Sequence, residues 1–197
     1  MNFGIPYTKD QIDKIGNTII YLAEKIQPLS KTQLLKLIYL IEEVSVKKYG
    51  MPFLNLRFDV WKFGPVSRDI YAELTGETFL LSKFIDKYQG ADNATYIKSI
   101  TAFSDDEFSD NEIELLDLVI SHYNLNATQL VKITHRKHSL WYTTAKKHNV
   151  LEYLEEGVMN TTDFEIDFSD LLIDEPEKKA FYLDNKEFLS QSKALKY

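Results

Sequence analysis

Cysteine is absent from this sequence of 197 residues, and glycine and proline are scarce. Without cysteine the chain can form no disulfide, no thiol nucleophile and no thiolate metal site. Seven glycines and five prolines are few for the many tight turns of an all-β protein, so the composition favours helices. The 12 tyrosines, 12 phenylalanines and 2 tryptophans supply enough apolar area for a substantial core.

Long apolar runs are also missing. The densest run, LLKLIYLI at residues 34–41, contains Lys36 and is far too short to cross a bilayer. The first residues, MNFGIPYTKDQ, have neither the basic region nor the apolar region of a secretory signal. These absences predict a soluble, cytoplasmic protein with no membrane partner.

Familiar catalytic motifs do not occur. The glycines are isolated, so there is no phosphate-binding G-x-x-x-x-G-K-S/T loop, and neither G-x-S-x-G nor H-E-x-x-H is present. Asp105, Asp106, Glu107 and Asp110 form a carboxylate cluster just ahead of a predicted helix. A solvated loop is a better interpretation of this cluster than an acid–base pair, which needs two opposed environments. The sequence therefore predicts a protein that is not an enzyme and needs no cofactor.

Three histidines raise the question of a metal site. His135 and His138 are three residues apart, a spacing at which two imidazoles on a helix can share a metal, and His148 follows ten residues later. Arg136 and Lys137, which lie between the first two, would repel a cation. We therefore predict no metal, and expect these rings to make structural hydrogen bonds or to face solvent.

The net charge of −7 is unevenly distributed along the chain. Residues 91–124 hold eight acids and one lysine, residues 125–149 hold five bases and no acid, and residues 150–175 hold nine acids and no base. The central basic segment is either an internal electrostatic match for its neighbours or a docking patch. Trp141 and Tyr142 within it leave nucleic-acid binding open, but the acidic total weighs against it.

Apolar periodicity and capping signals predict a mainly α, α+β protein, a compact helical domain with a small antiparallel sheet or hairpin. Thr8 with Gln11, and Ser30 with Gln33, have capping-box spacing ahead of two amphipathic segments. Residues 54–63 and 95–101 alternate as strands do and can pair with each other, whereas 79–90 fits a short helix or an extended segment. Helices are predicted at about residues 8–25, 30–49, 66–74, 109–124, 126–134 and 139–148, and from Pro176 onward.

The segment DVWKFGPVSRDIYAEL, residues 59–74, joins the first predicted strand to a helix. Gly64 supplies conformational freedom and Pro65 fixes φ, so the two are predicted to form a strand-to-helix corner. Trp61 and Phe63 precede this corner, and Val66 begins the helical spacing after it. Core packing and recognition of another molecule are both open roles for the aromatic side chains.

Three stretches carry a recognisable pattern when they are taken in order. They are LSKTQLLKLIYLIEEVSVKKYGMPF at residues 29–53, FDVWKFGPVSRDIYAEL at 58–74 and LVKITHRKHSLWYTTAK at 130–146. The W-x-x-G-P-V corner and the later T-H-x-x-x-x-x-W are the most specific parts. Together they resemble the Panacea domain, the SocA-like antitoxin family that also includes phage-associated GepA-type proteins. The resemblance covers about residues 8–150 and becomes vague after about 155.

This resemblance implies a mainly helical fold, no enzymatic activity, and an antitoxin that neutralises a cognate toxin by direct protein–protein contact. The toxin would be encoded next to it, and the acidic stretches at residues 105–117 and 152–175 would suit a basic toxin. Two alternatives stay open: an adaptor that delivers a toxin to a cytoplasmic protease, and a phage protein that binds a host factor. The implied organisation is a Panacea-like domain at residues 1–155 and a C-terminal extension at 156–197, packed on or continuous with that domain.

The resemblance also selects candidate site residues by their position in the motifs. We expect Trp61 and Tyr71 to pack together with His135 and Trp141, as a scaffold that can also present a toxin contact. Relatives often have tyrosine at the position of Phe63, so the aromatic ring is kept. The full set of candidates is Trp61, Phe63, Gly64, Pro65, Val66, Tyr71, His135 and Trp141.

Overall fold

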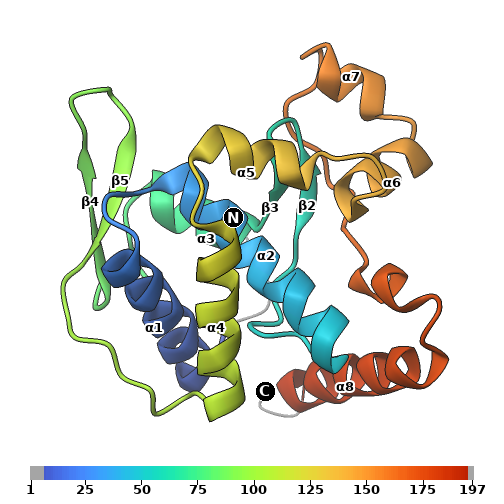
Figure 1. Ribbon diagram of the computed structural model, residues 1–197, viewed down its shortest axis with the longest axis horizontal. Coiled ribbons are helices and arrows are strands. Elements are labelled where there is room, and N and C mark those ends of the chain that lie inside the picture. Colours follow the sequence, from blue (N-terminus) through green and yellow to red (C-terminus); the bar gives the residue numbers. More distant parts are fainter. Residues whose placement is uncertain (1–6, 195–197) are drawn as a thin grey trace.

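A computed structural model describes residues 7–194 of the chain as a mainly helical α+β protein (Figure 1). This confirms the fold class predicted from the sequence. The helices are α1 (Lys9–Lys25), α2 (Lys31–Tyr49), α3 (Arg68–Thr75), α4 (Asp110–Tyr123), α5 (Ala127–Thr134), α6 (Leu140–Lys147), α7 (Leu151–Glu155), the 3₁₀-helix η1 (Phe168–Leu172) and α8 (Pro176–Ala194). The strands are β1 (Leu29–Ser30), β2 (Asp59–Trp61), β3 (Gly64–Val66), β4 (Ile85–Gln89) and β5 (Thr95–Ser99).

The two capping boxes predicted from the sequence are present in the structure. The hydroxyls of Thr8 and Ser30 each accept a hydrogen bond from the backbone N–H three residues later in the chain. The side-chain oxygens of Gln11 and Gln33 in turn accept a hydrogen bond from the backbone N–H of the cap residue. These reciprocal bonds satisfy backbone donors that would otherwise lack partners at the first turn. Gly50 ends α2 in the left-handed conformation with φ of 67°, which a residue without Cβ adopts readily.

Helix α2 is the centre of the fold and is buried on almost all sides. It contacts α4 and α5 on one side, η1 on another, and both small sheets. Leu34, Leu37 and Ile41 are completely buried, as the periodicity predicts for one face. Lys36 and Glu42 on the same helix are buried as well, which places two ionisable groups inside an apolar core.

The two small sheets differ in part from the prediction. Strand β5 pairs antiparallel with β4 and β1, so the predicted pairing of residues 95–101 with residues 54–63 is wrong. The predicted strand 54–63 is regular only at Asp59–Trp61, and its partner is β3. Residues 79–90 contain strand β4 rather than a helix, in agreement with the extended alternative.

The predicted strand-to-helix corner at Gly64 and Pro65 is also wrong. Trp61 faces Gly64 across the ladder, so the chain reverses over two residues, Lys62 and Phe63, in a tight hairpin. Gly64 has φ of 99°, outside the range that residues with Cβ prefer, and this allows the reversal. Pro65 therefore lies within a strand, and α3 begins three residues later, after Ser67.

The part of the chain after α7 runs back along the hairpin and continues into η1 and α8, which packs against η1 (Figure 1). The division expected at residue 155 stays a prediction. The prediction that the chain has no secretory signal rests in part on residues 1–6, which lie outside the described residues. Residues 195–197 of the expected C-terminal extension also lie outside them. Across residues 7–194, no helix combines the length and the apolar character needed to span a membrane.

Candidate functional site

The β2–β3 hairpin brings five of the eight candidate residues together and is held against α5 and α2. A Cβ placed on Gly64 would lie 2.8 Å from Thr134 Oγ1, 3.0 Å from His135 Cε1 and 3.0 Å from Lys36 Nζ. The hairpin backbone thus approaches two helices more closely than any residue with a side chain would allow. Gly64 is required both by its positive φ and by this contact.

A buried lysine on α2 binds the backbone of the hairpin. Lys36 is 2% exposed, and its Nζ donates a hydrogen bond to the carbonyl oxygen of Pro65 at 2.9 Å. Among the described residues it forms no ion pair with a carboxylate. Burial lowers the pKa of Lys36 to about 7, because the charged ammonium loses its hydration there. The lysine joins the central helix to the second strand of the hairpin.

Two aromatic rings from the later motif bind the first strand and the turn. The Trp141 indole Nε1 donates to the carbonyl oxygen of Trp61 at 2.8 Å, and the Trp141 ring is 1% exposed. His135 packs against it, with 4.0 Å between ring centroids, and its Nε2 lies 2.9 Å from the carbonyl oxygen of Lys62. The predicted contact of the two motifs is therefore present, and it is made through backbone carbonyls.

The surroundings of His135 do not suit a metal ligand. Its Nδ1 lies 2.7 Å from the Val131 carbonyl oxygen, so both ring nitrogens face acceptors. Burial lowers the pKa of His135, and the nearby charge of Lys36 adds to this effect. His138 and His148 are exposed. Within residues 7–194, no three side chains of His, Cys, Asp or Glu gather as a metal-binding group would.

Tyr71 on α3 extends the aromatic set. Its ring meets that of Trp61 edge to face, with 4.9 Å between centroids, a favoured geometry for an aromatic pair. Lys31 Nζ lies 5.3 Å from the centre of the Tyr71 ring. The expected cluster thus forms in two halves: Trp61 contacts Tyr71 through its ring and Trp141 through its backbone.

Phe63 is the exception among the candidates. It lies at the tip of the hairpin and is 65% exposed, whereas Gly64, Pro65, Val66 and Trp141 are buried. Trp61, Tyr71 and His135 are half-buried. Seven of the eight residues therefore build the hairpin and its support, and one projects an apolar ring into solvent.

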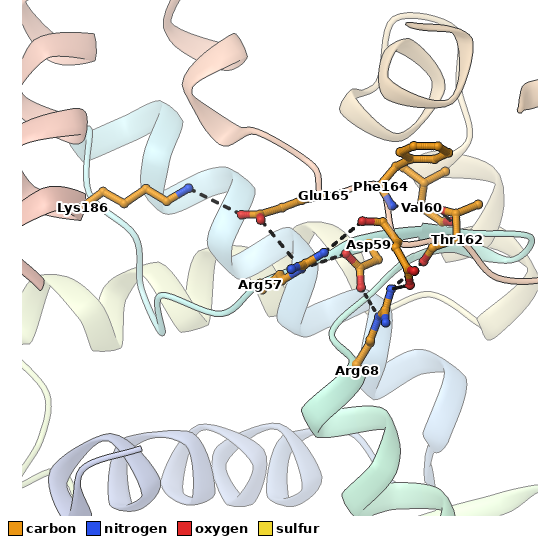
Figure 2. Close-up of polar contacts among 9 residues, drawn as sticks. Arg57, Asp59, Val60, Arg68, Thr162, Phe164, Glu165 and Lys186 are labelled. Carbon is orange, nitrogen blue, oxygen red and sulfur yellow. Dashed lines mark hydrogen bonds and ion pairs between the residues drawn. The ribbon is translucent and has the colours of Figure 1, made fainter. Parts of the chain in front are cut away.

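The outer edge of β2 carries a segment that the sequence did not predict. Residues 160–166 run antiparallel to β2, and we call this segment the clasp (Figure 2). The backbone N–H of Ile166 donates to Phe58 at 2.8 Å, that of Val60 to Phe164 at 3.0 Å and that of Lys62 to Asn160 at 2.9 Å. Thr162 Oγ1 also donates to the Val60 carbonyl oxygen at 2.6 Å.

Charged side chains hold the clasp in place. Asp59, which is 1% exposed, accepts hydrogen bonds from Arg57, at 3.0 Å, and from Arg68 (Figure 2). The same two guanidinium groups reach across to the clasp, where Arg57 donates to the Asp163 carbonyl oxygen at 2.9 Å and Arg68 to that of Thr162 at 2.8 Å. Arg68 also pairs with the Asp163 carboxylate. A buried carboxylate thus orients two arginines that bind the clasp backbone.

Sequence reasoning missed Lys36 and the arginines as parts of this site. Lys36 had one local signal, because it is the only charged residue in the run LLKLIYLI. The arginines had none, since their clasp partners lie about a hundred residues away. The carboxylate cluster Asp105, Asp106, Glu107 and Asp110 is exposed or half-buried, as a solvated loop would be.

A groove of about 840 Å³ lies elsewhere, between the start of α2, the tip of the β4–β5 hairpin and the start of α5. Ser30, Asp92, Tyr96 and Asn126 are among the residues that line it, and none of the eight candidates does. This groove is therefore separate from the hairpin and the residues that support it.

Comparison with known protein families identifies the family of this chain. Residues 34–142, more than half of the chain, match the family model described as antitoxin SocA-like, Panacea domain. The matched range contains the hairpin, Lys36 and both aromatic motifs, and it ends before the clasp. No curated protein and no solved structure matches the chain.

Proposed function

The chain belongs to the SocA-like antitoxin family with the Panacea domain, and from this premise we propose that it neutralises a cognate toxin by binding it directly. Family membership supports an antitoxin-type role in general and a role without enzymatic activity. The proposal adds that the toxin is a protein encoded by the neighbouring gene and that the complex forms in the cytoplasm.

The observation that carries the proposal is the construction of the hairpin. Lys36, His135 and Trp141 all bind its backbone rather than its side chains, so they fix the position of the tip. Phe63 is left 65% exposed at that tip. A rigid support under an exposed aromatic ring is typical of an interface anchor, because little conformational entropy is lost when the ring is buried by a partner.

The first experiment uses the neighbouring open reading frame. We would express that gene alone and together with this chain, and measure growth and co-purification. Toxicity alone, rescue on co-expression and a stable complex are the results expected for neutralisation by binding. The proposal would be contradicted if co-expression gave no rescue and the two proteins did not associate. Rescue with rapid loss of the toxin and no stable complex would instead favour the protease-adaptor alternative.

A variant at the tip connects this function to the site. Phe63→Ser is expected to weaken toxin binding about tenfold or more, since it removes an aromatic anchor. Phe79→Ser is the matched control, because Phe79 is 82% exposed and follows α3, away from the hairpin. Dissociation constants from calorimetry give the comparison, and equal binding by the two variants would contradict a role for the tip.

A further inference from the structure

Two further exposed apolar side chains lie close to the hairpin tip. Val158 is 73% exposed and Tyr153 is 52% exposed, which is comparable with the 65% exposure of Phe63. Tyr153 belongs to α7, and Val158 lies in the loop that leads from α7 to the clasp. Single exposed apolar residues are common on protein surfaces, but neighbouring ones around a rigid tip indicate a contact surface.

The contacts of Lys62 place the hairpin tip and the loop after α7 beside each other. Its Nζ lies 5.5 Å from the centre of the Phe63 ring, and its side chain also passes so near Gly157 that a Cβ there would be 2.5 Å from Nζ. Val158 follows Gly157 directly, and the Met159 N–H donates to the Tyr153 carbonyl oxygen at 3.0 Å. The turn of the hairpin and the α7 loop are also side by side in Figure 1.

The clasp fixes this arrangement. The Lys62 N–H donates to the Asn160 carbonyl oxygen at 2.9 Å, only two residues after Val158. Arg68 then binds the Thr162 carbonyl oxygen and the Asp163 carboxylate, so the clasp is held from α3 (Figure 2). The loop is therefore attached to the hairpin at the residue next to Phe63, and both parts are presented together.

We infer that Phe63, Tyr153 and Val158 form one toxin-binding surface, and that the α7 loop is the part that selects which toxin is bound. This inference rests on the proposed function. Phe63 lies inside the range that matches the family, whereas Tyr153 and Val158 lie outside it. The hairpin supplies the contact common to the family's motif, and the loop supplies a contact particular to this chain.

The charges beside the surface define the chemistry of the partner. Glu152, Glu155 and Glu156 are exposed on and just after α7, and they outnumber Lys62, the cation that lies between Phe63 and the loop. The surface therefore fits a protein that presents apolar side chains flanked by lysine or arginine. A stable complex buries about 1,200–2,000 Å² in total, so the three apolar residues would form its centre and the glutamates part of its rim.

The test compares two substitutions outside the matched range. Val158→Ser is expected to weaken binding of the purified toxin about tenfold, as for an interface anchor. Ile173→Ser is the matched control, since Ile173 is also β-branched, 67% exposed and outside that range, but lies at the end of η1. Both variants should melt at the wild-type temperature, which separates lost contact from lost fold.

The outcomes distinguish this inference from the proposed function. Weaker binding by Phe63→Ser with wild-type binding by Val158→Ser would overturn the role of the loop and leave the proposed function in place. Absence of binding by the wild-type chain would overturn both. Replacing Glu152, Glu155 and Glu156 by glutamine should also reduce the salt dependence of the association rate, and an unchanged salt dependence would contradict the basic character of the partner.

Discussion

Replacing Lys36 with methionine should change how the stability of this protein depends on pH. Methionine has a similar length and suits a core, so the packing around α2 should be kept. The hydrogen bond from Nζ to the Pro65 carbonyl oxygen is lost, which lowers the free energy of unfolding by about 1 kcal/mol at every pH. The pH dependence arises separately, from the titration of the lysine.

The size of the effect follows from the lowered pKa. Burial moves the pKa of Lys36 from 10.5 to about 7, so between these values the unfolded chain holds one proton more than the folded chain. Stability then rises with pH, by about 1.4 kcal/mol per unit where the lysine is charged only in the unfolded chain. Between about pH 7 and about pH 9.5 the wild type should gain about 3 kcal/mol from this group, and the Lys36→Met variant should not.

Urea unfolding of both proteins at several pH values in this window measures the difference. The window lies above the range in which His135 titrates, since its pKa is lowered from 6.5. Lys48→Met is the control, because Lys48 is exposed near the end of the same helix and its curve should run parallel to the wild type. Parallel curves for the wild type and Lys36→Met would refute the argument that a buried, desolvated lysine lies under the hairpin.

Two further predictions concern the hairpin and the clasp. Gly64→Ala should destabilise the protein by about 2–4 kcal/mol, since it combines a φ of 99° with contacts of 2.8–3.0 Å. Gly76→Ala is its control and should change the free energy of unfolding by no more than about 0.5 kcal/mol, because a Cβ there would meet nothing closer than 3.4 Å. Equal losses of stability in the two glycine variants, measured by urea unfolding, would contradict the argument from the close approach at Gly64. Asp59→Asn should lower the free energy of unfolding by about 2–3 kcal/mol, since a buried charge that pairs with Arg57 and Arg68 is removed. Asp86→Asn is the control and should have a much smaller effect, because its ion pair with Lys98 is exposed to solvent. A loss of similar size in both aspartate variants would show that burial of Asp59 does not matter.

The helices could be predicted because their signals are local. Capping residues and apolar residues at spacings of three and four lie within a single turn or two, as at Thr8 and Ser30. The hairpin was misread because Pro65 suits the first turn of a helix as well as a strand position that needs no N–H. Strand β1 consists of two residues, too few for any alternation to be visible.

The candidate site could be predicted only in part. The motif positions and the contact between their aromatic residues followed from the resemblance, but exposure of Phe63 and burial of the rest depend on three-dimensional packing. The clasp joins residues about a hundred positions apart, such as Val60 and Thr162, and its bonds are mostly to the backbone. Backbone bonds leave little trace in residue type, so the sequence carried no signal for them.

The clasp also protects the protein from self-association. A strand edge with free N–H and C=O groups is a template for pairing with another chain, and β2 would have such an edge if residues 160–166 were removed. On the other side of the hairpin, Pro65 offers no N–H to a new strand. Detachment of the clasp would uncover the N–H and C=O groups of Val60 and Lys62, so a variant that weakens its arginine contacts would be prone to pair edge to edge with a second copy of the chain.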